Sequence, residues 1–458
     1  MNAREWLLPR SHRDSQGRAL MKKTLALTWP ATVESIFVGM ASLVDSMMVS
    51  VLGTTAIAAV GLTNQPKFIA IAFITSLNVG VSAVISRRIG AERVEEAKDC
   101  LRQSLFCSAL ISLVVCGLSF LFARPYIQFA GAQADTLDLA VSYFRIVIVG
   151  QFFGNLGMTI NTAQRCAGNS RLSMQTNLTA NLVNVIFNYL LIEGHFEFPR
   201  LEIVGAALAT ALGSIVAFIM SARSLRSPKS PLCLRQKGSW LPRRATLKPL
   251  ADISFSALVE QACMRLGFFL YALIVAGLGT ELFATHQICM NICNICFSCY
   301  DGFTAAASAL VGQNLGRGRS DLSELSTRIC RRMAWAMAAV MILVLVLFRR
   351  SLIALFSSDP QIIAAGSLIM LIFAASVPAL SGLNVYSGAL QGAGDNRFVA
   401  LFAFISTTLI RPALSWFLCY PGGLGVYGPW IGLWVDFMLR YLLNLARYRK
   451  GIWKSRVV

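Results

Sequence analysis

Long apolar segments, separated by short polar connections, run through almost the whole chain. Most of them have about 20 residues or more, which is the length that an α-helix needs to cross the hydrocarbon core of a bilayer. The pattern predicts an all-α polytopic membrane protein with twelve membrane-spanning helices. Their apolar cores are expected at Leu25–Val51, Ile57–Ile85, Leu101–Phe122, Ala140–Ala163, Leu172–Leu191, Val204–Ala222, Ile253–Leu278, Phe283–Val311, Met333–Phe348, Ile362–Leu390, Phe398–Tyr420 and Val426–Leu445.

The two halves of the chain repeat each other at one constant offset. Leu-Gly-Thr occurs at residues 52–54 and again, 226 positions later, at 278–280, and at the same offset Glu34 falls on Glu260. Because six is an even number, each half begins on the same side of the membrane, so the repeats are parallel and related by an axis along the membrane normal. We expect two pseudo-symmetric six-helix bundles that enclose a cleft and rock to give alternating access to it.

The predicted division of the chain has five parts. Two six-helix lobes cover residues 24–223 and 249–446, and a basic cytoplasmic linker at 224–248 joins them. Residues 1–23 and 447–458 form polar, basic tails. The prolines and basic side chains of the linker are typical of a connection outside the membrane.

Composition and charge agree with this architecture. Hydrophobic residues make up 56% of the chain and charged residues 14%, and the mean hydropathy is +0.62. These values exclude a soluble globular domain. The net charge of +19 does not indicate nucleic-acid binding, because the basic residues cluster in the tails, the linker and the loops on one side of the membrane. This positive-inside distribution predicts that both termini are cytoplasmic.

Glu34, Asp45 and Glu260 are carboxylates within the predicted membrane segments, where a charge is costly and is normally kept for function. Glu34 and Asp45 share the first segment, which contains no Lys or Arg, and Glu260 lies in the seventh. Glu34 and Asp45 are eleven residues apart, so they share one face of a helix, roughly 16 Å apart along its axis. We expect Asp45, Glu260 and Glu34 to bind a coupling ion and the charged group of a cationic substrate, with Glu34 and Asp45 facing one cavity.

A narrow stripe of asparagines follows the fifth segment. Asn177, Asn181, Asn184 and Asn188 recur at helical spacing and therefore share one face. Asparagine can coordinate a cation through its carbonyl oxygen, and it also joins membrane helices by hydrogen bonds. Four on one face favour a cavity-lining role over packing.

The second half carries different chemistry. Tyr271 replaces Asp45 at the repeat-equivalent position, and we expect it to line the cavity as well. Lys67, Arg265 and Arg411 are cations that lie in or beside apolar segments. They are candidates for binding an anion or for pairing with the carboxylates.

The cysteines of the eighth segment resemble a metal motif by spacing alone. Cys289, Cys293, Cys296 and Cys299 lie in a continuous apolar helix, where the sulfur atoms form a row that cannot close a tetrahedron around a metal ion. We expect them to pack in the core, with no metal site and no cofactor. A membrane-embedded enzyme such as a prenyl transferase is disfavoured, because no paired acidic Mg²⁺ motif lies in or next to the apolar segments.

Several motifs in order along the chain resemble the multidrug and toxic compound extrusion (MATE) family of secondary transporters. The resemblance extends from about Lys22 to Arg447. The motifs are VDSMMVSVLGTTAIAAVGL with Asp45, SRRIGAERVEEA, RCAGNSR, NLTANLVNVIFNYLLI, LVEQA with Glu260, LGTELFATHQ, ALVGQNLGRGR and GALQGAGDNR.

The resemblance implies a V-shaped pair of six-helix bundles that exports cationic, amphipathic compounds in exchange for Na⁺ or H⁺. The family's first-helix aspartate falls on Asp45, its fifth-helix amides on Asn184 and Asn188, and its seventh-helix glutamate on Glu260. Some branches carry an aspartate in the tenth helix, where this chain has Leu380 and Ser381, and others carry one in the fifth helix, at Asn188. The coupling ion therefore stays open between Na⁺ and H⁺.

The function expected from the sequence is that of a cation-coupled antiporter for cationic drugs or toxic compounds, which contributes to antibiotic resistance. It is expected to act as a monomer among the lipids of the plasma (inner) membrane, with small organic cations as substrates. The alternative on the same fold is a flippase or exporter of a lipid-linked or anionic metabolite, with Arg265, Arg411 and Lys67 as anion-binding residues.

Overall fold

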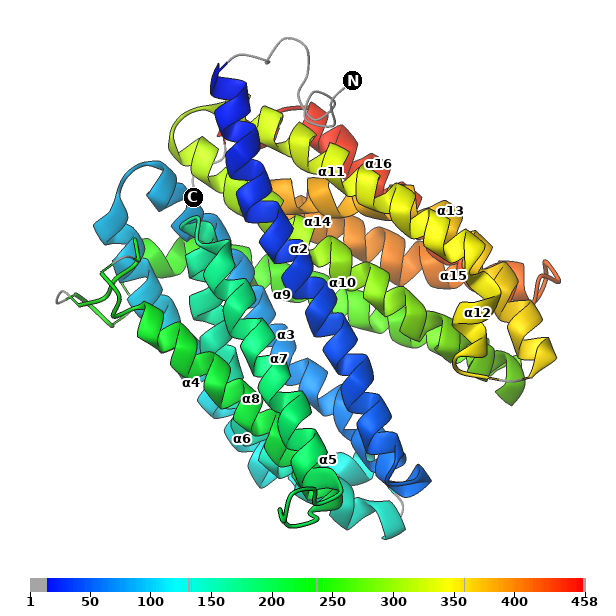
Figure 1. Ribbon diagram of the computed structural model, residues 1–458. Coiled ribbons are helices and arrows are strands. Elements are labelled where there is room, and N and C mark those ends of the chain that lie inside the picture. Colours follow the sequence, from blue (N-terminus) through cyan, green and yellow to red (C-terminus); the bar gives the residue numbers. More distant parts are fainter. Residues whose placement is uncertain are drawn as a thin grey trace. The chain divides into compact units, whose positions relative to one another are not determined.

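The computed structural model describes residues 15–130, 132, 134–228, 230–235, 238–241, 243–357 and 359–455. Within these ranges the secondary structure is helical and contains no strand, so the predicted all-α fold class is confirmed (Figure 1). The helices are α2 (Ser15–Ser50), α3 (Thr54–Gly90), α4 (Val94–Leu121), α5 (Ala123–Phe129), α6 (Ala134–Cys166), α7 (Ser170–Ile192), α8 (Glu202–Ser224), α9 (Arg244–Ala276), α10 (Thr280–Gly316), α11 (Ser320–Leu347), α12 (Arg349–Ala354), α13 (Pro360–Gly392), α14 (Asn396–Ala403), the π-helix η2 (Phe404–Ile410), α15 (Arg411–Cys419), α16 (Tyr427–Arg449) and the 3₁₀-helix η3 (Ile452–Ser455).

Each of the twelve predicted membrane segments coincides with a long helix. In the described part of the chain, ten helical stretches are long and apolar enough to cross a membrane, and α14, η2 and α15 together make one of them. The two remaining predicted segments are α7 and α16, each a helix of 23 residues. The short helices α5 and α12 were not predicted, because six or seven residues give too little periodicity to recognise.

The internal repeat extends to the bounds of the helices. Helix α3 begins 226 residues before α10 and ends 226 residues before it, and the same offset separates α4 from α11 and α6 from α13. The short helices repeat too, since α5 begins at Ala123 and α12 at Arg349. The two halves therefore use the same helices in the same order.

The chain divides into two compact units, and the boundary falls within α2. Residues 33–254 form the N-terminal unit, whereas residues 1–32 and 255–458 form the C-terminal unit. In the N-terminal unit, α3, α4, α7 and α8 surround α6 (blue to green in Figure 1). The first part of the linker belongs to this unit, where the Gln164 amide donates hydrogen bonds to Ser224 (3.2 Å) and Ser230 (2.9 Å).

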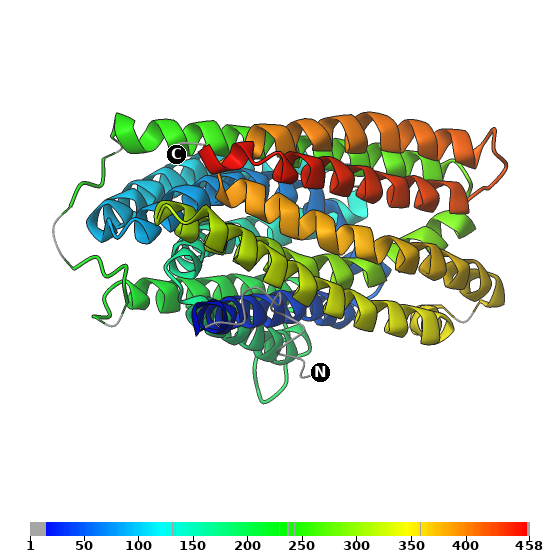
Figure 2. The ribbon, with the colours of Figure 1, turned by 90° about the horizontal axis from the view of Figure 1, so that it is seen from above.

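The C-terminal unit is built around α13, which lies beside α10, α11 and α16 (Figure 2). Gly388 and Gly392 of α13 lie against the backbone carbonyl groups of Thr304 and Ser308 on α10, where a Cβ atom would overlap them. Small residues at this spacing allow two membrane helices to approach closely.

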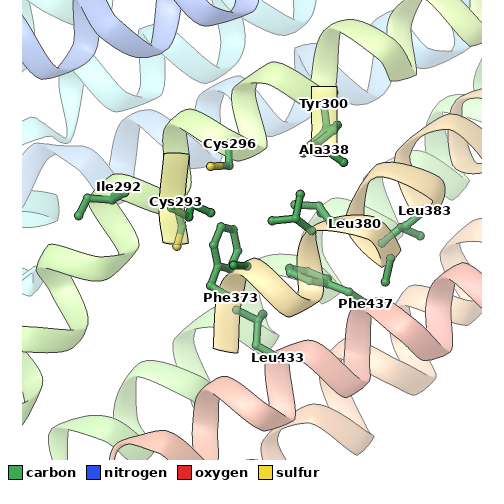
Figure 3. Packing of buried hydrophobic residues seen from close by; sticks show 14 of the residues in the cluster. Ile292, Cys293, Cys296, Tyr300, Ala338, Phe373, Leu380, Leu383, Leu433 and Phe437 are labelled. Carbon is green, nitrogen blue, oxygen red and sulfur yellow. The ribbon is translucent and has the colours of Figure 1, made fainter. Parts of the chain in front are cut away.

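The cysteine row of α10 lies in the apolar core of this unit. Cys289, Cys293, Cys296 and Cys299 are all almost fully buried and form no disulfide. Figure 3 shows Cys293 beside the ring of Phe373, which belongs to α13. Among the described residues no group of His, Cys, Asp or Glu side chains could hold a metal ion. The environment supports the packing interpretation of the row.

Candidate functional site

The two carboxylates of α2 in the N-terminal unit contact the asparagine stripe of α7. Asn177 Nδ2 donates a hydrogen bond to Glu34 Oε1 at 2.5 Å, and Asn188 Nδ2 donates one to Asp45 Oδ1 at 2.7 Å. Both pairs are separated by 143 residues. Since Glu34 and Asp45 are as far apart in sequence as Asn177 and Asn188, α2 and α7 run parallel and in register here.

Asp45 lies in a hydrogen-bonded polar network that joins three helices, α2, α7 and α8. Asn188 also donates to Asn184 at 3.3 Å, and Asn184 donates to Thr210 of α8 at 3.3 Å. Within the described residues, the buried Oδ1 atom of Asn188 has no hydrogen-bond donor, and the buried amide nitrogen of Asn181 has no acceptor. A carbonyl oxygen without a donor beside a carboxylate is a suitable ligand for a small cation.

A lysine from α3 completes the surroundings of Asp45. Lys67 interacts electrostatically with Asp45, and its ammonium group lies 5.4 Å from the ring centre of Tyr143 on α6. The sequence named Lys67 as one of the cations that could pair with a carboxylate or bind an anion. The structure places it in electrostatic range of Asp45, which favours the first of these two roles.

Glu34 lies in a different environment from Asp45. Its Oε1 atom accepts hydrogen bonds from Arg165 (3.2 Å) and Ser173 (3.0 Å) in addition to Asn177, and the side chain is only 6% exposed. The guanidinium group of Arg165 compensates the charge directly. This arrangement is a buried ion pair, which favours a structural role for Glu34.

Glu260 is the repeat equivalent of Glu34, but the residue that contacts it is of a different type. Gln391 Nε2 donates to Glu260 Oε2 at 3.4 Å, and the two residues are 131 apart, as are Arg165 and Glu34. An amide thus replaces a guanidinium at the equivalent place of the repeat. The nearest compensating charge is Arg440 of α16, which interacts with Glu260 electrostatically. Glu260 is half-buried, so its carboxylate is more accessible than that of Glu34.

A second charged cluster in the C-terminal unit surrounds Asp436. This carboxylate is fully buried, and it lies 2.9 Å from Arg440 Nη2 and 3.5 Å from Arg411 Nη1. Ser406 and Thr407 of η2 donate hydrogen bonds to its Oδ1 at 2.7 and 3.1 Å. The wider turn of a π-helix brings these hydroxyl groups and Arg411 to one carboxylate; π-helical turns are frequent at functional sites.

Arg411 and Tyr271 are neighbours in this cluster, whereas Arg265 lies elsewhere. Arg411 is fully buried, with its guanidinium carbon 4.2 Å from the ring centre of Phe268 and 5.5 Å from that of Tyr271. Tyr271 is 1% exposed, so it belongs to the interior of the unit. Arg265 lies on the exposed face of α9.

The sequence analysis missed Asp436 and Arg440. Both lie in the predicted segment Val426–Leu445, four residues apart, which places them on one face of the helix. A charged pair at this spacing within an apolar segment was the signal that could have identified them.

The sequence model of the MatE family matches the chain twice, at residues 30–190 and 257–417. The two matches follow the internal repeat, one in each half.

Curated relatives match along nearly the full length. A probable multidrug resistance protein NorM from Thermotoga maritima is 25% identical over 446 residues, which cover 96% of this chain and 94% of that protein. The uncharacterized transporter YisQ from Bacillus subtilis is also 25% identical, with coverage of 93% and 94%. Among solved structures, a MOP superfamily transporter from Pyrococcus furiosus has a TM-score of 0.88 at 21% identity, and the match covers 95% of this chain and 97% of that one.

Proposed function

The chain belongs to the MatE family of multidrug efflux transporters, and from this premise we propose that it is a cation-coupled antiporter that exports cationic, amphipathic compounds by alternating access. Members of this family are multi-pass membrane transporters and not enzymes. The coupling ion is H⁺ or Na⁺, which the protein carries as a substrate, and no cofactor takes part.

The observation that supports this proposal most directly is the environment of Asp45. Asn188 presents its amide N–H to one oxygen of the carboxylate, while its own carbonyl oxygen has no donor. A carboxylate with an adjacent free carbonyl oxygen can receive either a small ion or the ammonium group of a larger molecule. A cation bound at Asp45 neutralises the carboxylate and weakens its attraction for a second cation. The ion and the cationic compound therefore compete for Asp45, and this competition couples their transport.

The transport cycle follows from this competition. When the site faces the outside, H⁺ or Na⁺ binds at Asp45 and displaces the cationic compound. When it faces the cytoplasm, the ion leaves, and the bare carboxylate attracts the next cation in surroundings of low dielectric constant, where charge pairing is strong. Lys67 sets the strength of that attraction, because its ammonium group competes for the same carboxylate. Glu260 contributes a second carboxylate in the C-terminal unit.

The location expected for this activity is the inner membrane, with both termini in the cytoplasm, as the distribution of basic residues predicts. The protein acts as a monomer surrounded by lipid. Drug export on this scheme would contribute to antibiotic resistance.

The alternative function, export of an anionic or lipid-linked metabolite, depends on Arg265, Arg411 and Lys67. The contacts of two of these residues count against it. Arg411 is buried beside Asp436, and Lys67 interacts with Asp45, so neither offers an uncompensated positive charge.

The deciding experiment measures efflux of a fluorescent lipophilic cation from everted vesicles, with an imposed pH gradient in one set and an imposed Na⁺ gradient in the other. Wild type should transport under one gradient, and Asp45→Asn should lose at least about 30-fold in coupled rate, since removing one partner of a buried charge pair costs about 2–5 kcal/mol. Folded wild type that moves the cation under neither gradient would contradict the proposal. The anionic alternative would then be tested with Arg411→Gln.

A further inference from the structure

Helix α10 has two opposite faces with opposite chemistry. Cys289, Cys293, Cys296 and Tyr300 form the face that packs into the core of the C-terminal unit, as Figure 3 shows for the last three. About 200° around the helix, a polar stripe occupies the other face. It consists of Gln287, Asn291, Asn294, Ser298 and Asp301, at positions i, i+4, i+7, i+11 and i+14.

The helices of its own unit leave this stripe uncovered. Gln287, Asn291, Asn294 and Asp301 are exposed, and Ser298 is half-buried. The Ser298 hydroxyl donates to the backbone carbonyl of Asn294 at 2.9 Å. For the four exposed side chains the described residues provide no hydrogen-bond or ion-pair partner. In this respect they differ from the stripe of α7, two members of which contact carboxylates.

Asp301 lies at membrane depth, and the described part of the chain provides no ion-pair partner for it. It is 21 residues after the start and 15 before the end of α10, a helix of 37 residues. Glu34, Asp45, Glu260 and Asp436 each have a hydrogen-bond partner among the described residues. A carboxylate that faced lipid hydrocarbon at this depth would be costly, which favours water on the exposed face of α10.

The fold itself does not require a polar face here. At the repeat offset of 226, Asp301 corresponds to Thr75, Asn294 to Phe68, and Gln287 to Gly61 on α3. The same helix in the N-terminal unit therefore lacks the carboxylate and most of the amides. A feature that one repeat needs and its equivalent does not is more readily explained by function than by packing.

We propose that Asp301, with Gln287, Asn291 and Asn294, forms a second binding site for the cationic group of the transported compound. The inference rests on the proposed function and adds a location on the C-terminal unit. The carboxylate supplies the attraction, and the amide oxygens accept hydrogen bonds from a protonated amine. Four polar side chains along about 20 Å of helix allow a cation to move from one contact to the next.

The first test measures binding of ethidium, a fluorescent cation, to the full-length protein in lipid nanodiscs. Asp301→Asn should weaken binding at least about tenfold, which corresponds to one charge contact of 1.4 kcal/mol, and Asp301→Glu should restore it. The matched control is Asp138→Asn, which removes an exposed carboxylate paired with Arg124 on the same protein. Equal affinities of Asp301→Asn and Asp138→Asn would overturn the proposal.

The second test measures water access and does not depend on transport. Asn294→Cys, 14 residues after the start of α10, should react with a membrane-impermeant cationic methanethiosulfonate. Ala336→Cys, exposed on α11 and 11 residues before the end of that helix, should not. The unmutated chain gives the baseline for its 12 cysteines. Ethidium should slow labelling of Asn294→Cys, and the addition of Asp301→Asn should remove this protection.

The two proposals fail in distinguishable ways. In one outcome, gradient-driven efflux depends on Asp45, but Asn294→Cys reacts with the reagent as little as Ala336→Cys does. This outcome would support the antiporter and exclude the α10 site. Protection of Asn294→Cys by ethidium in a protein without gradient-driven efflux would retain the site and exclude antiport.

Discussion

Asp45 in the N-terminal unit and Asp436 in the C-terminal unit are both carboxylates at membrane depth, but different groups stabilise their charges. Asp45 projects from α2 and is held by an amide, with one lysine in electrostatic range. Asp436 projects from α16 and is held by two arginines and two hydroxyl groups. At the repeat offset of 226, Tyr271 occupies the position equivalent to Asp45, and Thr210 occupies the position equivalent to Asp436.

The difference teaches that the repeated backbone fixes where a polar cluster forms, and the side chains decide whether it can exchange its cation. Arg440 and Arg411 cannot leave Asp436, because both belong to the chain. Under the proposed function, a small ion bound at Asp45 leaves the site in each transport cycle. A buried carboxylate that is paired with arginines of the same chain stabilises the fold. A carboxylate beside a carbonyl oxygen that can still accept a ligand is suited to a role in transport.

The largest effect is expected at Asp436. Asp436→Asn leaves two buried guanidinium groups without their counter-charge, and it should lower the free energy of unfolding by about 3–5 kcal/mol. Thermal unfolding in detergent measures this loss. Asp45→Asn, which removes a charge that is not tied to an arginine, should unfold close to the wild-type temperature. An unchanged midpoint in Asp436→Asn would erase the distinction between the two sites.

A smaller effect is expected from making the N-terminal unit resemble the C-terminal one. Asn188→Leu copies Leu414, its repeat equivalent, and removes the 2.7 Å hydrogen bond to Asp45. Because a hydrogen bond to a charged group contributes about 1.5–3 kcal/mol, the ion concentration for half-maximal efflux should rise at least about tenfold. Asn181→Leu is the control on the same stripe, since its amide nitrogen has no acceptor. Equal effects of the two variants would show that Asn188 does not act through Asp45.

The smallest effect is expected at Lys67. Lys67→Met removes the lysine that competes for Asp45, so a cationic substrate should bind a few-fold more tightly, in line with about 1 kcal/mol for a partly screened charge pair. Lys67→Arg keeps the charge and serves as the control. Equilibrium binding of ethidium distinguishes them. Weaker binding in Lys67→Met would mean that Lys67 holds Asp45 in place and does not compete with the substrate.

The fold was largely accessible from the sequence, and the candidate site only in part. Twelve helices, the 226-residue repeat and the asparagine stripe follow from local patterns that need no knowledge of contacts. The stripe predicted which face of α7 is polar, and the structure adds that Asn177 meets Glu34 while Asn188 meets Asp45. Asp301, Asp436 and Arg440 are charged residues in apolar segments, but they were not among the predicted site residues.

What the sequence determined by itself is the twelve membrane-spanning segments, their repeat and the polar face of α7, because hydrophobic periodicity and the spacing of polar residues can be recognised within a single segment. What only the tertiary structure decided is which carboxylate is compensated. Arg165 reaches Glu34 from 131 residues away, and Gln391 takes the same place beside Glu260. The charge balance of a buried group depends on its neighbours in space, and those neighbours come from helices that only packing brings together.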